Sequence, residues 1–195
     1  MNDSARRLER WTPGHTEADR FDAACAVKDR AYAEMMSPRS PEEAEARRSR
    51  QRGTWTSGDG GAPHAMLHVL LDGDQPVAVA TTFARTIVTE AGPLDVLALS
   101  GVAVDPDRQR AGLGERVVRD AFQRIGELGV PLSLYQTGLA RGFYEKLGAR
   151  CVDNWFFDSK AKAPKANPWF DRYVMIYPAE APWPAGSIDL GGPAY

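Results

Sequence analysis

Two glycines at the expected start of a helix are well placed to do chemistry. Gly112 and Gly114 follow an apolar run that ends at Val104, and residues 113–128 repeat with helical periodicity. The first turn of a helix leaves about four backbone N–H groups without partners and carries roughly half a positive charge. Because glycine adds no side chain, an anion can approach these groups closely. The pattern favours a phosphate-binding loop, with a plain tight turn as the alternative.

Two familiar nucleotide loops do not fit these residues. The glycine-rich loop that ends in Lys-Ser or Lys-Thr is absent, which removes support for ATP. In the dinucleotide pattern Gly-x-Gly-x-x-Gly, Val117 stands where the third glycine belongs. NAD therefore loses support as well.

The loop resembles the acyl-CoA signature of a known family. The run Gln109-Arg110-Ala111-Gly112-Leu113-Gly114 is similar to the Gln/Arg-x-x-Gly-x-Gly/Ala signature of the GCN5-related N-acetyltransferases (GNAT family). Downstream, Phe143-Tyr144-Glu145-Lys146-Leu147-Gly148 resembles the family segment Phe-Tyr-x-Lys-x-Gly. In strand and helix order the resemblance covers residues 65 to about 177. It implies acetyl-CoA as cosubstrate and no metal.

The resemblance implies a set of cofactor-binding residues. They are Val102, Ala103, Val104, Gln109, Arg110, Ala111, Gly112, Leu113 and Gly114. The amides from Arg110 to Gly114 would cradle the pyrophosphate, with Gln109 at the mouth of the loop. The strand ending at Val104 would splay from the strand 132–136, which leaves backbone groups of Val102 and Val104 for the pantetheine arm. The Val102 amide would donate to the thioester carbonyl.

Tyr144 matches the family position that protonates the departing thiolate. Phenol and thiol pKa values, roughly 10 and 8.5, are close enough for this transfer. The alternative is a tyrosine that only packs on its helix.

The base that deprotonates the acceptor amine is left open. In some family members a glutamate stands four residues before the position of Val102, but here that residue is Ala98. Other groups remain open as bases, none of them chosen: Ser100, Glu34, His64, His68 and the terminal carboxylate of Tyr195.

The acceptor pocket is expected between the first two helices, the strand edges and the C-terminal part. Its candidate lining residues are Met35, Met36, Trp155, Phe156 and Trp183. Such side chains suit an acceptor with an apolar or aromatic part, although core packing is the more common role of methionine and aromatic residues.

The elements that must hold these groups follow from local patterns. Helices are predicted at 17–36 (with a capping box at Thr16–Asp19), 41–52, 113–128 and 139–147, and a flexible loop at 53–63. Strands are predicted at 7–12, 65–71, 77–88, 96–104, 132–136, 151–157 and 172–177. The order indicates an α+β protein with a GNAT-like, mixed, mostly antiparallel central sheet of six to seven strands and about four helices.

Composition sets the outer limits. The 195 residues suit a single acetyltransferase domain (1–195), whose proline-rich segment 178–195 is expected to be irregular and packed back. A net charge of -2 argues against a nucleic-acid partner, and the apolar runs are too short to cross a membrane. Without a secretion signal the expected location is cytoplasmic. Cys25 and Cys151 fit neither a metal site nor a disulfide framework and are interpreted as small buried groups.

The sequence therefore predicts an N-acetyltransferase that acts on a primary amine, with a small molecule as the expected acceptor. A protein lysine or N-terminal acetyltransferase is the first alternative. A non-catalytic CoA-binding regulatory module is the alternative of another class, followed by a ligand-free structural domain. A homodimer formed through the C-terminal segment is a further hypothesis.

Overall fold

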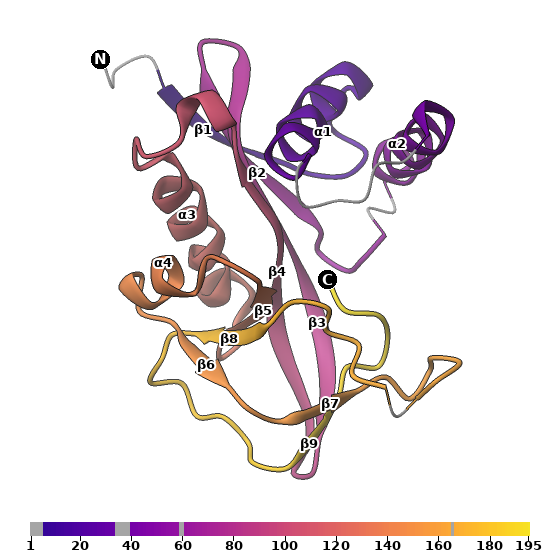
Figure 1. Ribbon diagram of the computed structural model, residues 1–195, viewed down its shortest axis with the longest axis vertical. Helices are drawn as coiled ribbons and strands as arrows, with labels where there is room; N and C mark the ends of the chain where they lie inside the picture. Colours follow the sequence, from indigo (N-terminus) through magenta and orange to yellow (C-terminus); the bar gives the residue numbers. More distant parts are fainter. Residues whose placement is uncertain (1–5, 34–39, 59–60, 165) are drawn as a thin grey trace. The chain divides into compact units, whose positions relative to one another are not determined.

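The computed structural model describes residues 6–33, 40–58, 61–164 and 166–195 (Figure 1). Within these ranges the chain forms four α-helices and nine strands. They group into two compact units, residues 1–83 with 101–121 and residues 84–100 with 122–195. Each unit is described by itself below.

The first unit contains β-strands β1 and β2, parts of two further strands, and the helices next to them in sequence. Its elements are β1 (Arg6–Trp11), α1 (Ala18–Ala31), α2 (Pro41–Thr56), β2 (Met66–Asp72), the beginning of β3 (Gln75–Thr89), the end of β4 (Gly92–Val104), a 3-10 turn (Pro106–Arg108) and the first half of α3 (Leu113–Leu128). β2 pairs with β1 and with β3, so that Leu67 lies between Trp11 and Thr81. The apolar run of β2 is almost wholly buried, as expected of a strand with neighbours on both edges.

Helices α1 and α2 lie side by side (Figure 1). The rings of Phe21 and Trp55 stack with their centroids 5.2 Å apart, and both side chains are buried. This contact explains why α2 continues to Thr56 although the sequence predicts its end at residue 52. The predicted loop at 53–63 therefore begins later than expected.

The helix starts differ from the sequence prediction. α1 has Glu17 as its N-cap without a side-chain cap, and the Thr16 hydroxyl donates instead to the carbonyl of Thr12 (3.0 Å). The capping box predicted at Thr16–Asp19 is wrong because this turn takes up the hydroxyl. A capping box does form at α2, where Ser40 and Glu43 bond reciprocally.

The second unit is built around β5. Its further elements are the end of β3, the beginning of β4, the second half of α3, β5 (Ser133–Thr137), α4 (Arg141–Lys146), β6 (Arg150–Val152), β7 (Trp155–Phe157), β8 (Tyr173–Tyr177) and β9 (Ser187–Asp189). β5 pairs in parallel with β4 and antiparallel with β8, which also pairs antiparallel with β6. β9 lies between the end of β3 and β7.

The α+β class with a mostly antiparallel sheet and four helices is confirmed. The predicted strand count is too low for two reasons. The expected strand at 151–157 is split into β6 and β7, which pair with different neighbours. The C-terminal segment, expected to be irregular, contains β9, because Ile188 and Leu190 are fully buried in the core of this unit.

Candidate functional site

The loop between β4 and α3 has the backbone shape that an anion site requires. Arg110 and Gly112 have φ values of +64° and +75°, while Ala111 between them has no positive φ. A left-handed residue in such a turn can direct successive N–H groups into one concavity. A Cβ added to Gly112 would meet no atom of the described residues within 4 Å, so the concavity is open. All residues from Pro106 to Gly112 are exposed.

The first turn of α3 continues this donor surface. The first α-helical bond within it runs from the Arg116 N–H to the Gly112 carbonyl (3.2 Å). The amides of residues 113–115 precede that bond and are the ones a helix start leaves for other acceptors. Leu113 is buried and anchors the turn, so its side chain does not face the ligand side. The loop residues and this turn together can hold a diphosphate.

A charged cluster holds α3 in the first unit. The Asp120 carboxylate accepts three hydrogen bonds from Arg10 (3.1, 2.9 and 2.8 Å) and one from Nδ1 of His68 (2.6 Å). Nε2 of His68 contacts the hydroxyl of Thr82 (2.9 Å), and His68 is fully buried. Burial alone would raise the pKa of Asp120, but the hydrogen bonds from His68 and Arg10 hold it below its usual value. The cluster joins α3 to β1, β2 and β3.

At the end of β4, backbone groups point alternately toward β3 and away from it. The Asp105 N–H donates to the carbonyl of Val77 in β3 (2.9 Å). Because alternate residues of a strand direct their backbone groups to opposite edges, Val102 and Val104 direct theirs to the other edge. There the Tyr32 hydroxyl donates to the Val102 carbonyl (2.5 Å). The expectation that this carbonyl is free is therefore wrong, because α1 ends where Tyr32 can reach it.

A lysine that the sequence analysis did not single out lies beside this strand end. Nζ of Lys28 donates to the hydroxyl of Thr81 in β3 (2.8 Å). Gly101 has a φ of +57°, and a Cβ there would lie 3.0 Å from Nζ of Lys28. Burial lowers the pKa of Lys28. The one available signal was a lysine on the otherwise apolar face of α1, between Ala24 and Ala31.

Tyr144 lies in the second unit, on the buried face of α4. Its ring is 5% exposed and packs against Tyr135, with centroids 4.7 Å apart, and against Phe143 at 5.0 Å. The nine predicted cofactor residues lie in the first unit. These ring contacts fix the orientation of Tyr144. A fixed ring is compatible with a role as thiolate acid and with a packing role.

The groups left open as a base have different surroundings. His68 belongs to the Asp120 cluster, with both ring nitrogens bonded. Ser100 is half-buried at the edge of the second unit, and the main-chain carbonyl of Tyr195 accepts from Gln136 (3.2 Å). Glu34 lies outside the described residues.

The residues proposed for the acceptor pocket have mostly structural surroundings. Phe156 is buried against Trp169, and the indole N–H of Trp183 donates to Asn154 (2.6 Å). Trp155 is 61% exposed. Met35 and Met36 lie outside the described residues. Both cysteines are free thiols and are half-buried, less buried than expected.

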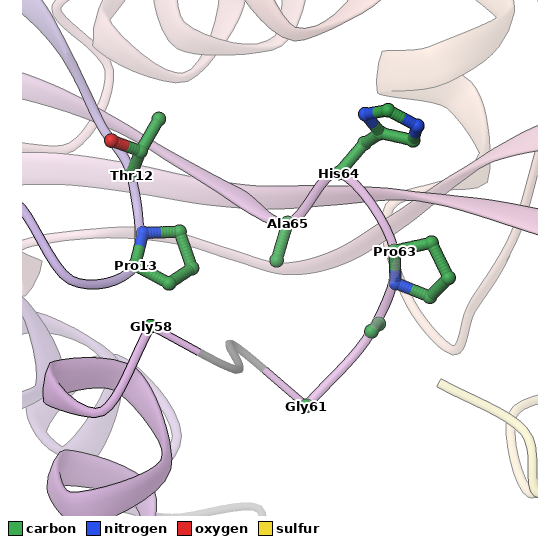
Figure 2. A pocket seen from close by; sticks show the side chains of 8 residues that line it. Thr12, Pro13, Gly58, Gly61, Pro63, His64 and Ala65 are labelled. Carbon is green, nitrogen blue, oxygen red and sulfur yellow. The ribbon is translucent and has the colours of Figure 1, made fainter.

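One pocket of about 560 Å³ opens in the first unit (Figure 2). It is lined by Thr12, Pro13, Gly58, Gly61, Ala62, Pro63, His64 and Ala65. Its lining is small and apolar apart from Thr12 and His64, and His64 has a φ of +54°. Of the open base positions that the structure describes, His64 is the one on this lining.

Comparison with known proteins identifies the family. The model of the acetyltransferase (GNAT) domain matches residues 14–152, which include residues 109–114 and Tyr144. The chain therefore belongs to the GNAT family. No curated protein sequence matches it.

Solved structures of the same fold are distant in sequence. A protein from Pyrococcus horikoshii OT3 has a TM-score of 0.61 at 18% identity, over 87% of this chain and 97% of its own. A GCN5-related N-acetyltransferase from Kribbella flavida has a TM-score of 0.57 at 17% identity, over 77% of this chain but only 35% of its own. An aminoglycoside acetyltransferase from an uncultured soil metagenomic sample has a TM-score of 0.52 at 14% identity, over 74% and 86%. This chain thus spans about a third of the Kribbella protein.

The described ranges contain no helix that is both long and apolar enough to cross a membrane. They also contain no group of three or more histidine, cysteine or acidic side chains arranged to hold a metal ion.

Proposed function

We propose that this chain transfers the acetyl group of acetyl-CoA to a primary amine, with a small molecule as the acceptor. The neutral amine attacks the thioester carbonyl carbon, a C–N bond forms and the C–S bond breaks. Tyr144 gives its phenolic proton to the departing thiolate. The scheme requires no metal.

The open loop around Gly112 is the observation that carries the proposal. It combines a left-handed backbone, exposed amides and the N-terminus of a four-turn helix. The diphosphate of coenzyme A has the charge and size that such a site binds. Membership of the GNAT family supports acetyl-CoA over other diphosphates.

The direction of the strand end supports the catalytic geometry. The Val102 amide lies on the same edge of β4 as its carbonyl, away from β3. In the second unit the parallel pairing of β4 with β5 covers only Leu97 with Ser133 and Ala98 with Leu134, although β5 continues to Thr137. An amide beyond the paired stretch is available to stabilise the oxyanion, and one comparable donor contributes about 3 kcal/mol.

The acceptor class is inferred from one solved structure of the same fold and from the net charge. The fold is shared with an aminoglycoside acetyltransferase, whose name specifies a small amine-bearing acceptor. The net charge of -2 is compatible with a cationic amine and unfavourable for nucleic acid. A cytoplasmic location and a homodimer stay predictions.

The test combines binding and turnover. Thiol release from acetyl-CoA is measured with a panel of primary amines, and acetyl-CoA affinity is measured by calorimetry for Gly112→Asp. The new carboxylate and Cβ stand where the pyrophosphate is proposed to bind, so we expect affinity to fall at least about 100-fold, equivalent to ~2.7 kcal/mol. Gly73→Asp is the matched control, because Gly73 is also exposed, with a φ of +62° and open space around its Cα.

The outcomes separate the alternatives. Equal acetyl-CoA affinity in wild type and Gly112→Asp would refute the loop assignment. Binding without thiol release across the amine panel would favour a protein acceptor or a regulatory CoA-binding module. Absence of acetyl-CoA binding would leave a ligand-free structural domain.

A further inference from the structure

The amine of Lys28 lies against the strand end that the proposed reaction uses. Its Nζ and Cε lie 3.0 and 3.2 Å from the position of a Cβ at Gly101, the residue directly before Val102. One helical turn later, Tyr32 bonds the Val102 carbonyl. α1 and the residue after it therefore place an amine beside Gly101 and a phenol beside Val102, the residue of the proposed oxyanion donor. Glycine at 101 leaves the space that the lysine occupies.

The surroundings of Lys28 favour a neutral amine more than ordinary lysine surroundings do. Thr81 from β3 is its hydrogen-bond acceptor, and among the described residues no carboxylate forms an ion pair with it. The charged and titratable groups that face it are Cys25 and Asp29 on α1 and Arg47 on α2, and Gly101 on β4 adds none. Burial is the largest influence on the pKa of Lys28 and lowers it; Arg47 also lowers this pKa, whereas Cys25 and Asp29 raise it.

The described residues offer few other proton acceptors for the reaction. Ala98 stands where some family members have a glutamate. His68 is fully buried and bonded through both ring nitrogens to Asp120 and Thr82. Lys28 is a basic group directly beside the strand end at Val102.

We propose that Lys28 is the general base that removes the proton from the acceptor ammonium ion beside Gly101 and Val102. This inference rests on the proposed acetyltransferase function. An alkylammonium ion cannot attack a thioester until it loses a proton. Neutral Lys28 accepts that proton and passes it to solvent. After attack, the nitrogen loses a second proton. This proton makes up for the one that Tyr144 gives to the thiolate.

The experiment compares two acceptors whose need for a base differs. An alkylamine is protonated at neutral pH, whereas an alkoxyamine is neutral and needs no base before attack. We expect Lys28→Met to lower kcat/KM for the alkylamine roughly 10²–10⁴-fold. The loss for the alkoxyamine is expected to be much smaller. Methionine retains the length and apolar stem of the side chain, and unchanged acetyl-CoA affinity will show an intact fold.

Two further variants sharpen the result. Lys28→Arg keeps a cation that stays protonated, so it should lose activity on the alkylamine as Lys28→Met does. Lys162→Met, at an exposed position, is the control and should keep wild-type rates on both acceptors.

Each other outcome overturns the inference. Equal losses on the two acceptors would assign Lys28 a structural or binding role. Full activity of Lys28→Arg would show that the cation, not the base, is needed. Acetylated Lys28 in mass spectra of the wild type under turnover would make the amine a nucleophile. If the wild type releases no thiol with either acceptor, the proposed function itself fails. A failure of the Lys28 proposal alone looks different, because the wild type is then active.

Discussion

At the scale of residues, two neighbouring buried tyrosines are expected to differ in role: Tyr144 as a proton donor and Tyr135 as a packing residue. Tyr135 and Tyr144 pack ring against ring in the second unit. The Tyr135 hydroxyl is buried without a hydrogen-bond partner among the described residues, and burial raises its pKa. Such a phenol is a poor proton donor and a cost to folding. Tyr144, at the family position of the thiolate acid, is the one expected to react.

This contrast gives a matched pair of variants. Tyr144→Phe should lower kcat for thiol release at least about 100-fold, because it removes the proposed acid while the ring stays in place. Tyr135→Phe removes a partnerless hydroxyl from the same cluster and should leave kcat unchanged, with an unchanged or higher melting temperature. Equal kcat in wild type and Tyr144→Phe, with acetyl-CoA saturating, would show that the tyrosine only packs.

The residues of the proposed phosphate loop could be singled out from local sequence alone. Gly112 and Gly114 lie at a helix start, and their spacing shows this without any knowledge of the tertiary fold. Lys28 and Tyr32 were not predictable as site residues, because they reach Gly101 and Val102 only through the packing of α1 on strands about 50–70 residues away in sequence. A lysine on an apolar helix face has an ordinary explanation in a sequence, since its stem can cover the core while the amine reaches solvent.

At the scale of elements, the position of α3 depends on a polar cluster as well as on its apolar face. The apolar residues 113, 117, 118, 121, 122, 125 and 128 predicted the buried side of the helix. The first five are buried, whereas Ile125 and Leu128 are half-buried. Asp120 adds the contacts to Arg10 and His68 that attach the helix to β1 and β2. Only the folded chain brings these partners together, so sequence spacing could not reveal them.

The cluster predicts a specific loss of stability in acid. A pKa of Asp120 that is lower in the folded state than in the unfolded state stabilises the fold above the unfolded value, about 3.9. This contribution is lost as pH falls through the folded-state pKa. Asp120→Asn should lower the free energy of unfolding at neutral pH by about 1–3 kcal/mol, because Arg10 and His68 lose their charged acceptor. Its stability should also change less between about pH 7 and pH 3 than that of the wild type.

Urea denaturation across this pH range measures both effects. Asp153→Asn, which removes an exposed carboxylate, is the control and should follow the wild-type curve. A wild-type acid dependence retained in full by Asp120→Asn would show that other carboxylates are responsible.

At the scale of the whole molecule, the question is whether the two units unfold together, and three elements shared by both units are relevant to it. β3, β4 and α3 each contribute residues to both units. A strand or helix that is part of two cores cannot lose one of them without strain on its other half. We therefore propose that residues 1–195 form one cooperative domain, with the C-terminal segment as an integral part of it.

The C-terminal segment offers a way to test this cooperativity. Ile188 is fully buried in β9 and pairs with Thr89 and Phe156, while Arg85 bonds the carbonyls of Leu190 and Pro193. Ile188→Ala should lower the free energy of unfolding by about 2–5 kcal/mol, because it leaves a cavity in the core of the second unit. Leu139→Ala is the control, since Leu139 is 86% exposed.

Hydrogen exchange then shows how far the loss extends. In one cooperative domain, Ile188→Ala lowers the protection of the most stable amides of β2 in the first unit as much as that of β8 amides in the second. If β2 amides keep their wild-type protection while β8 amides lose theirs, the units unfold independently and the single-domain proposal fails. Equal losses would instead mean that the buried end of the chain stabilises the unit containing the phosphate loop, so that shortening the C-terminus weakens acetyl-CoA binding through stability alone.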